Sequence, residues 1–173
     1  QALYYARSEH TEKDYSVREV RLFDVVHQAI AENKYLLLQN SVSIELQETD
    51  DTVYSDEKWI CFILNQLIVN AVKYRTAQPI LKFYTERQNN QVVLCVQDNG
   101  IGIDAGDLPR IFEKGFTGKN GRETGQNATG IGLYLCKRLC DKLDIGISAV
   151  SASGGTTIRL SFLMNDFIQR VQG

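Results

Sequence analysis

The sequence lacks the features that mark several common classes of protein. No apolar run reaches the roughly 18 residues that a membrane-spanning helix needs; the longest candidate, residues 59–72, is interrupted by Asn65, Gln66 and Asn70. The formal net charge is only −2, which gives no reason to expect binding to nucleic acid or to an anionic membrane surface. A P-loop motif is absent, and no G-x-G-x-x-G connects a first strand to a helix, which excludes P-loop and Rossmann nucleotide sites.

Cysteine is scarce, with four residues and no C-x-x-C pair. Cys136 and Cys140 lie four apart in an expected helix, but two thiols without a nearby histidine make a poor zinc site. We therefore predict reduced thiols packed as small hydrophobic side chains, which favours a reducing, cytoplasmic compartment. The chain also starts without methionine and shows no signal peptide, so we expect it to be a piece of a longer protein.

What the sequence does contain suits one α/β or α+β domain: 173 residues, 43% of them hydrophobic. We expect residues 1–14 to be a helix end and linker, 15–165 the domain and 166–173 a tail. Period-two alternation and hairpin signals predict extended segments at 15–22, 41–47, 79–88, 92–97, 145–152 and 156–163. Helical spacing predicts helices at 22–39, 56–74 and 130–143.

The stretch "VQDNGIGI", residues 96–103, ends a β-branched run on an acid that is followed by two closely spaced glycines. Alone, D-x-G-x-G is explained by a tight turn. The later stretch "NATGIGLYL" places Gly130 and Gly132 at a helix start, where exposed N–H groups favour phosphate. A loop-to-helix turn explains it equally well. Between them, residues 104–129 have five glycines and no periodicity, which is typical of a functional lid.

A polar stripe runs along the helix expected at 56–74. Gln66, Asn70 and Lys73 are spaced by four and three residues, so they share a face, while the apolar residues of the same helix occupy the opposite side. A solvated face is one explanation. The other is a metal–phosphate site, because an Asn oxygen is a hard ligand for Mg²⁺ and a Lys ammonium attracts phosphate.

In chain order these motifs resemble the ATP-binding domain shared by gyrases, heat-shock chaperones, histidine kinases and mismatch-repair ATPases. "NQLIVNAVKY" is similar to its asparagine box, "DNGIGI" to its first glycine box, "IFEKGF" to its phenylalanine box and "TGIGL" to its second glycine box. The resemblance covers about residues 16–163 and is nearest to bacterial sensor histidine kinases of the intramembrane-sensing, bacitracin-sensor kind. It implies an α+β, two-layer Bergerat fold. A mixed, mostly antiparallel sheet is covered on one face by about three helices, with a long ATP lid.

The resemblance also implies roles for individual residues. Asp98 accepts a hydrogen bond from the adenine amino group, Thr156 supports the same edge and Tyr74 flanks the base. Asn70 holds Mg²⁺ and Lys73 reaches phosphate. The glycine boxes contribute Gly100, Gly102 and Ile103, and Thr129, Gly130, Ile131, Gly132 and Leu133. Phe112 pins the lid or a partner domain, and Lys114, Lys119 and Arg122 are candidates for contact with the γ-phosphate.

The sequence departs from the family pattern at two positions. Ala128 stands where a further glycine usually opens the second glycine box, which implies a modest effect on lid packing. Gln66 stands four residues before Asn70, where hydrolysing members carry a glutamate that activates water. Because a neutral amide cannot act as a general base, this favours phosphoryl transfer over hydrolysis.

We therefore expect the catalytic domain of a two-component sensor histidine kinase, which transfers the γ-phosphoryl group of Mg-ATP to a histidine on a separate dimerisation domain. Neither His10 nor His27 precedes an acid as a phosphoacceptor would, so both are expected to be ordinary residues. Expected partners are ATP, Mg²⁺, the dimerisation domain, a response regulator and a transporter. The fragment is expected to be monomeric, and the full protein a membrane-anchored homodimer with this domain in the cytoplasm. The alternatives are an ATPase, a related serine kinase and a degenerate docking module.

Overall fold

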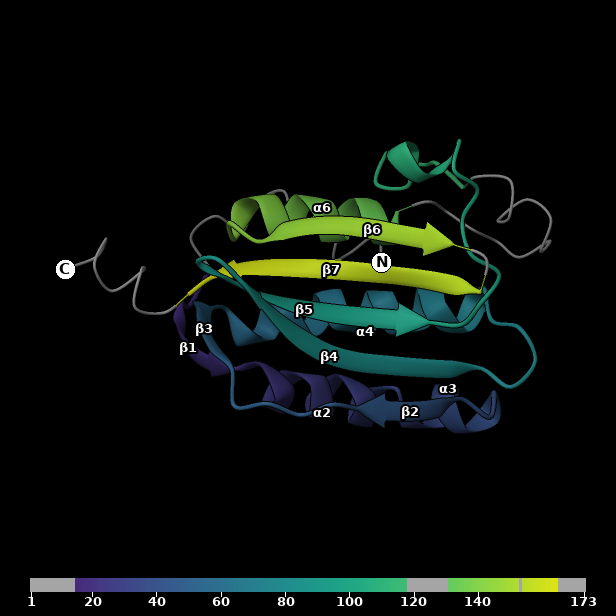
Figure 1. Ribbon diagram of the computed structural model, residues 1–173. Coiled ribbons are helices and arrows are strands. Elements are labelled where there is room, and N and C mark those ends of the chain that lie inside the picture. Colours follow the sequence, from purple (N-terminus) through teal and green to yellow (C-terminus); the bar gives the residue numbers. More distant parts are fainter. Residues whose placement is uncertain (1–14, 118–130, 153, 165–173) are drawn as a thin grey trace.

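The computed structural model describes residues 15–117, 131–152 and 154–164, which form two layers (Figure 1). A five-stranded sheet has the strand order β2-β4-β5-β7-β6, and β1 and β3 form a separate two-stranded sheet. The strands are β1 (Arg18–Arg21), β2 (Ser43–Leu46), β3 (Thr52–Ser55), β4 (Ile80–Gln88), β5 (Gln91–Asp98), β6 (Gly146–Ala152) and β7 (Gly155–Leu163). The helices are α2 (Leu22–Glu32), α3 (Lys34–Gln39), α4 (Glu57–Lys73) and α6 (Gly132–Lys142), with a short 3₁₀ turn, η1 (Leu108–Arg110).

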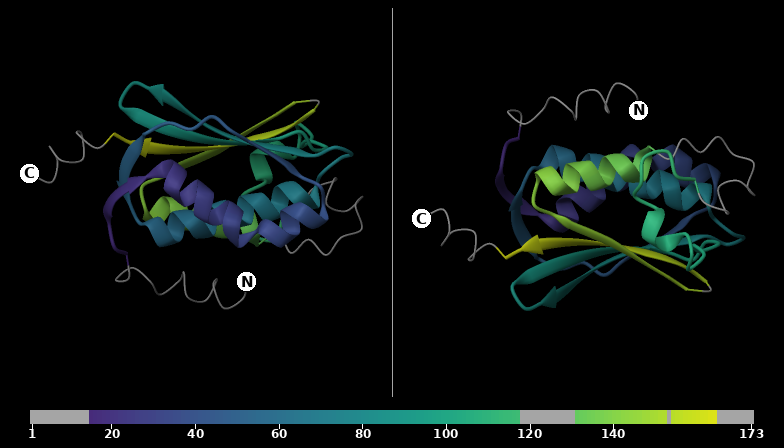
Figure 2. Two further views of the ribbon diagram at one scale, coloured as in Figure 1. Left: turned by 90° about the horizontal axis from the view of Figure 1, so that it is seen from below. Right: turned by 90° about the horizontal axis from the view of Figure 1, so that it is seen from above.

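The main sheet is antiparallel except for one parallel pair, β2 with β4. The inward side chains of its central strands are apolar and buried, as the alternation predicted: Phe83, Leu94, Val96, Ile158 and Leu160. The helices cover this inner face and leave the other face bare, which both views in Figure 2 show. The predicted mixed, mostly antiparallel sheet with helices on one side is therefore confirmed.

Helix α4 lies at the centre of the helical layer. The Asp56 carboxylate caps its start by accepting a hydrogen bond from the Trp59 backbone N–H at 3.2 Å, as Ser, Thr, Asp and Asn do at helix N-termini. Residues around much of its circumference are buried, including the consecutive residues Trp59, Ile60 and Cys61. The predicted limits, Ser55 or Asp56 to Tyr74, agree with the observed ones.

Two details of the predicted elements are wrong. The single helix expected over residues 22–39 is broken at Asn33, which has φ −109° and ψ 18°. Its side-chain amide donates to the Ala29 carbonyl and to Asn65 Oδ1, both at 2.8 Å. These side-chain hydrogen bonds compete with the backbone hydrogen bonds that would continue the helix. In addition, strand β3 was not predicted, although it pairs with β1 along its full length.

The four cysteines are buried free thiols, so the prediction of thiols packed as hydrophobic side chains is confirmed. Burial raises the pKa of Cys140 to about 12 and also raises that of Cys136. Among the described helices, none has both the length and the apolar character needed to cross a bilayer.

Candidate functional site

A row of polar side chains lies at one edge of the inner face of the sheet, where the apolar side chains stop. Register places three residues side by side across β5, β7 and β6 at each level: first Leu94, Leu160 and Ile147, then Val96, Ile158 and Ala149. The next level is Asp98, Thr156 and Ser151. We call these last three residues the polar row. Two apolar levels therefore give way at one step to a carboxylate and two hydroxyls that face the helical layer.

Asp98 is the charged member of the polar row. Its Oδ1 accepts hydrogen bonds from the backbone N–H of Gly100 at 2.9 Å and of Thr156 at 3.3 Å. Burial raises the pKa of this carboxyl, although the two N–H groups act in the opposite direction. The two hydrogen bonds therefore do not fully offset the cost of burying the negative charge of Asp98. Because a carboxylate can only accept hydrogen bonds, the site favours a ligand that supplies a donor.

The loop after Asp98 is held against the end of α4. The Ile101 N–H donates to the Tyr74 carbonyl at 3.0 Å. A side chain on Gly100 would collide with the same carbonyl, which is why only glycine fits. Asn99 closes the other side, since its Oδ1 accepts from the Ile80 N–H at 2.7 Å. Gly100 thus serves the contact between loop and helix, a reason that the sequence did not reveal.

Ser151 joins the same loop to the β6–β7 hairpin. Its Oγ accepts from the Ile103 N–H at 2.8 Å and donates to the Gly155 carbonyl at 3.0 Å. Gly155 has φ +140°, and a Cβ there would collide with the Asp98 carbonyl. Sequence reasoning missed Ser151, because only the register that pairs it with Thr156 places it in the polar row.

The predicted polar stripe of α4 is half-buried rather than solvated: Gln66, Asn70 and Lys73 are all of intermediate exposure. Gln66 faces the start of α6, where a Cβ on Gly132 would lie 3.0 Å from Gln66 Oε1. Burial lowers the pKa of Lys73, whose Nζ lies 5.7 Å from the centre of the Tyr74 ring. Burial also raises the pKa of Tyr74 itself.

The end of α4 meets the end of β5 across a small cavity of about 10 Å³, whose lining includes Ala71, Val72 and Asp98. The structure therefore brings α4, the loop after β5 and the start of α6 to one end of the molecule, as Figure 1 shows. Ile131 and Leu133 at the start of α6 are half-buried.

The described part of the predicted lid, residues 104–117, is anchored by Ile111, which is buried. Phe112 is half-buried and Lys114 is exposed. The Lys114 Nζ lies 5.8 Å from the centre of the Tyr134 ring on α6, so this candidate for phosphate contact is near the start of that helix. The remaining predicted lid and glycine-box residues lie outside the described residues: Lys119, Arg122, Ala128, Thr129 and Gly130.

The two histidines were expected to be ordinary residues. His27 lies on the surface of α2, where its Nε2 is 2.8 Å from Glu48 Oε1. His10 lies outside the described residues.

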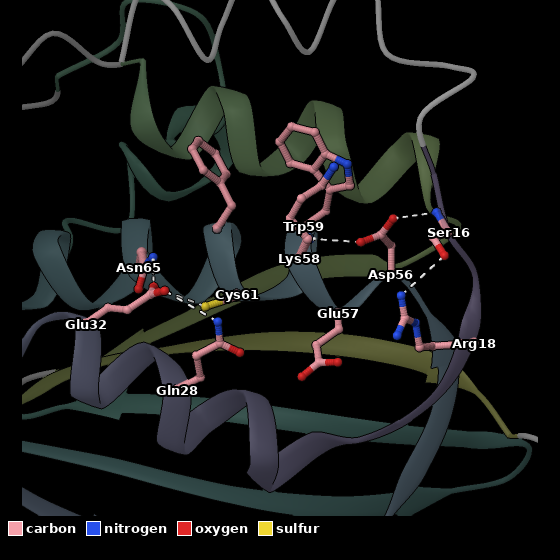
Figure 3. A pocket seen from close by; sticks show the side chains of 11 residues that line it. Ser16, Arg18, Gln28, Glu32, Asp56, Glu57, Lys58, Trp59, Cys61 and Asn65 are labelled. Carbon is pink, nitrogen blue, oxygen red and sulfur yellow. Dashed lines mark hydrogen bonds between the residues drawn. The ribbon is translucent and has the colours of Figure 1, made fainter.

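A second hollow, of about 510 Å³, lies near the start of α4 (Figure 3). Its lining includes the carboxylates of Glu32, Asp56 and Glu57. A hydrogen bond from Asn65, followed by one from Cys61, lowers the pKa of Glu32 and keeps it ionised. The lining also includes the cations Arg18 and Lys58, but the three carboxylates outnumber them. Because carboxylates repel a polyphosphate, this groove is a poorer candidate for a nucleotide than the end of α4 that carries Asn70.

The residues present fit Mg²⁺ only together with a phosphate ligand. In the part of the chain that the structure describes, no group of three or more His, Cys, Asp or Glu side chains is placed to hold a metal. Mg²⁺ commonly takes one or two protein oxygens and completes its shell with water and substrate phosphates. The Asn70 carboxamide oxygen suits that arrangement.

Comparison with known proteins identifies the family. Residues 55–166 match the family described as "Histidine kinase-, DNA gyrase B-, and HSP90-like ATPase". The chain belongs to this family. The match to these ATPases spans α4, the loop after β5, α6 and the β6–β7 hairpin, which carry the polar row and the polar stripe.

Individual relatives narrow the family to sensor kinases. The chain is 40% identical over 171 residues to the sensor protein BceS of Halalkalibacterium halodurans, covering 98% of this chain and 51% of BceS. It therefore spans about half the length of the curated relatives it matches. The Acinetobacter baumannii histidine kinase AdeS has a TM-score of 0.73 at 23% identity, covering 94% of this chain and 77% of that one. The histidine kinase ThkA, solved in complex with response regulator protein TrrA, has a TM-score of 0.71 at 15% identity. The match covers 95% of this chain and 49% of the ThkA chain.

Within the family, the chain is the ATP-binding catalytic domain of a bacterial two-component sensor histidine kinase of the bacitracin-sensor type. The predicted Bergerat fold is confirmed. The ligand roles of individual side chains stay predictions.

Proposed function

We propose that this domain binds Mg-ATP at the polar row and the end of α4, and transfers the γ-phosphoryl group to a histidine on a separate dimerisation domain of the same kinase. The observation that carries the proposal is Asp98. It is a carboxylate whose pKa is raised by burial and which lies at the abrupt end of an otherwise apolar sheet face. An adenine amino group supplies the donor that this carboxylate needs.

Asn70 and Lys73 serve the phosphates in this proposal. Both project from the last turn and a half of α4, half-buried beside Tyr74. Asn70 gives its carboxamide oxygen to Mg²⁺, and the metal ion, when bound, neutralises charge on the phosphate oxygens. Lys73 places a positive charge near them. Tyr74 lies next to both, because its backbone N–H donates to the Asn70 carbonyl at 3.2 Å and its ring centre lies 5.7 Å from Lys73 Nζ. In this proposal its ring flanks the base.

Gln66 favours transfer to a protein acceptor over hydrolysis. Its carboxamide lies beside Gly132 at the start of α6, near the region proposed for the phosphates. A carboxylate at this position would activate water, whereas an amide cannot take a proton from it. Catalysis by this domain therefore consists mainly of positioning and charge neutralisation.

The proposed partners follow from the transfer. The dimerisation domain precedes this domain, with residues 1–14 as the end of its helix and the linker. A response regulator then receives the phosphoryl group; the solved complex of ThkA with TrrA shows such an association for that kinase. We further propose that the full-length protein is a membrane-anchored homodimer that works with a transporter, with this domain in the cytoplasm and monomeric on its own.

One experiment separates transfer from hydrolysis. The chain is incubated with γ-labelled ATP and Mg²⁺, alone and with the kinase's dimerisation domain supplied at high concentration, which partly replaces the tether. The expected result is acid-labile label on the added domain and only trace release of free phosphate. Steady phosphate release by the chain alone would support an ATPase instead. Label on His27 or His10 would contradict their assignment as ordinary residues.

A further inference from the structure

We infer that Ser151 is a positioning residue for base recognition, because it fixes which way the Thr156 hydroxyl donates and so makes the polar row acceptor-only toward a ligand. The inference rests on the proposed function, since it concerns how the proposed site distinguishes one purine from another. Ser151 lies on β6, outside every motif that the sequence revealed.

Only one arrangement of protons makes all three contacts of the Ser151 hydroxyl hydrogen bonds. A serine hydroxyl has a single proton and two lone pairs. The proton is donated to the Gly155 carbonyl at 3.0 Å, and one lone pair accepts from the Ile103 N–H at 2.8 Å. The second lone pair faces Thr156 Oγ1 at 3.2 Å. Because the Ser151 proton is already committed, the Thr156 hydroxyl is the donor in this contact.

Thr156 then has only acceptor capacity left for a ligand or for an ordered water beside it. Its neighbour Asp98 is a carboxylate and also accepts only. The backbone N–H of Thr156 is committed as well, because it donates to Asp98 Oδ1 at 3.3 Å. The row therefore presents two acceptors side by side, which match the amino group of a 6-aminopurine. A 6-oxopurine would place a carbonyl oxygen against them.

The surroundings of Thr156 limit the acceptors available to its hydroxyl and hold its backbone in place. Its side chain is 9% exposed, so bulk water does not readily supply an alternative acceptor for its proton. The hairpin backbone is fixed too, because Gly155 packs against the Asp98 carbonyl with no room for a side chain. Ser151 is the hydrogen-bond partner of the Thr156 hydroxyl, and its removal would free that hydroxyl to turn and donate to a ligand.

The test compares ATP with inosine triphosphate, which differs at the 6-position of the base. Dissociation constants of both nucleotides are measured by titration calorimetry for the wild-type chain, Ser151→Ala and Ser151→Thr. Ser151→Ala is expected to lower the preference for ATP roughly fivefold, the effect of one neutral hydrogen bond. Ser151→Thr keeps a hydroxyl and is expected to retain the preference. Thermal unfolding of each variant checks that the fold persists.

A double-mutant cycle shows whether Ser151 acts through Thr156. In a Thr156→Val background the hydroxyl is gone, so Ser151→Ala should no longer change the preference for ATP. An equal loss of affinity for both nucleotides in Ser151→Ala would show a merely structural role and overturn the inference. A fivefold change that persists in the Thr156→Val background would also overturn it.

Failure of the proposed function gives a different result. If the wild-type chain binds ATP and inosine triphosphate equally, recognition of the amino group at the polar row is refuted, and the role of Ser151 with it. If the wild-type preference exists and survives Ser151→Ala, only the role of Ser151 is refuted. If Ser151→Ala does not fold, Ser151→Cys makes the same test, because a thiol is a much weaker hydrogen-bonding partner.

Discussion

Two carboxylates, Asp51 and Asp98, are held against opposite ends of strand β4. Asp98 lies beside Leu81 near the start of the strand. Asp51 contacts its far end, where it accepts from the Thr85 hydroxyl at 2.6 Å and from Arg87 Nε at 2.9 Å. Thr49 donates a further hydrogen bond to Asp51 at 2.7 Å. Asp98 instead receives two backbone N–H groups and no cation within the described residues.

The two pKa values move in opposite directions as a result. Burial raises the pKa of Asp51, but hydrogen bonds from Thr85, Thr49 and Arg87 outweigh it, so the net shift is downward. For Asp98 burial prevails and the pKa is raised. The difference shows how a structural carboxylate is distinguished from a site carboxylate. The chain itself supplies hydroxyl and guanidinium partners for Asp51, whereas in the proposed function the missing donor for Asp98 comes from the ligand.

The largest expected effect is loss of stability at the Asp51 end. Asp51→Ala should reduce the free energy of unfolding by about 2–4 kcal/mol, because several charge-assisted and hydroxyl hydrogen bonds are lost together. Urea denaturation measures the change. Asp50→Ala is the matched control, since Asp50 is 97% exposed and pairs only with Arg21 among the described residues; it should change stability by less than about 0.5 kcal/mol. Equal losses in the two variants would contradict the structural role of Asp51.

At the Asp98 end the expected effect is on binding and not on stability. Asp98→Asn should weaken ATP binding roughly 10- to 100-fold, because a charge-assisted hydrogen bond contributes about 1.5–3 kcal/mol. The free energy of unfolding at pH 7 should stay level or rise, because a buried, under-compensated charge has been removed. Calorimetric titration with ATP and GTP gives the affinities. An unchanged affinity together with an unchanged preference over GTP would remove Asp98 from the site.

The smallest effect is the pH dependence, which should have opposite form at the two ends. The folded pKa of Asp51 lies below the ordinary value of 3.8, so its contribution to stability is present above pH 3.8 and is lost as the pH falls through the folded value. The folded pKa of Asp98 lies above 3.8, so ionisation opposes folding increasingly as the pH rises from 3.8 through the folded value.

Stability curves of Asp51→Asn and Asp98→Asn against the wild-type chain, from pH 2.5 upward, test this. As the pH rises, the wild-type chain should become increasingly more stable than Asp51→Asn and increasingly less stable than Asp98→Asn. Two differences with the same slope would show that the carboxylates are equivalent.

Sequence reasoning succeeded where local periodicity decides the outcome. The β4–β5 hairpin, the limits of α4 and the last two strands follow from alternation, helical spacing and a capping aspartate. Sequence reasoning failed where a residue distant in the chain determines the local structure. The break at Asn33 depends on Asn65, 32 residues later, and the position of Ser151 depends on the register between β6 and β7. The glycine motifs indicated the site, but not that Gly100 is required by the Tyr74 carbonyl.

Helix α4 connects the chain at Ser16 to the loop that follows Asp98. At its start the Asp56 carboxylate accepts from the Ser16 N–H at 2.7 Å, and at its end the Tyr74 carbonyl accepts from the Ile101 N–H at 3.0 Å. The 17 residues between these contacts form a continuous helix about 25 Å long. A continuous helix is stiff along its axis. A force applied to the chain ahead of Ser16 therefore acts on one end of a rod whose other end carries the loop beside Asp98.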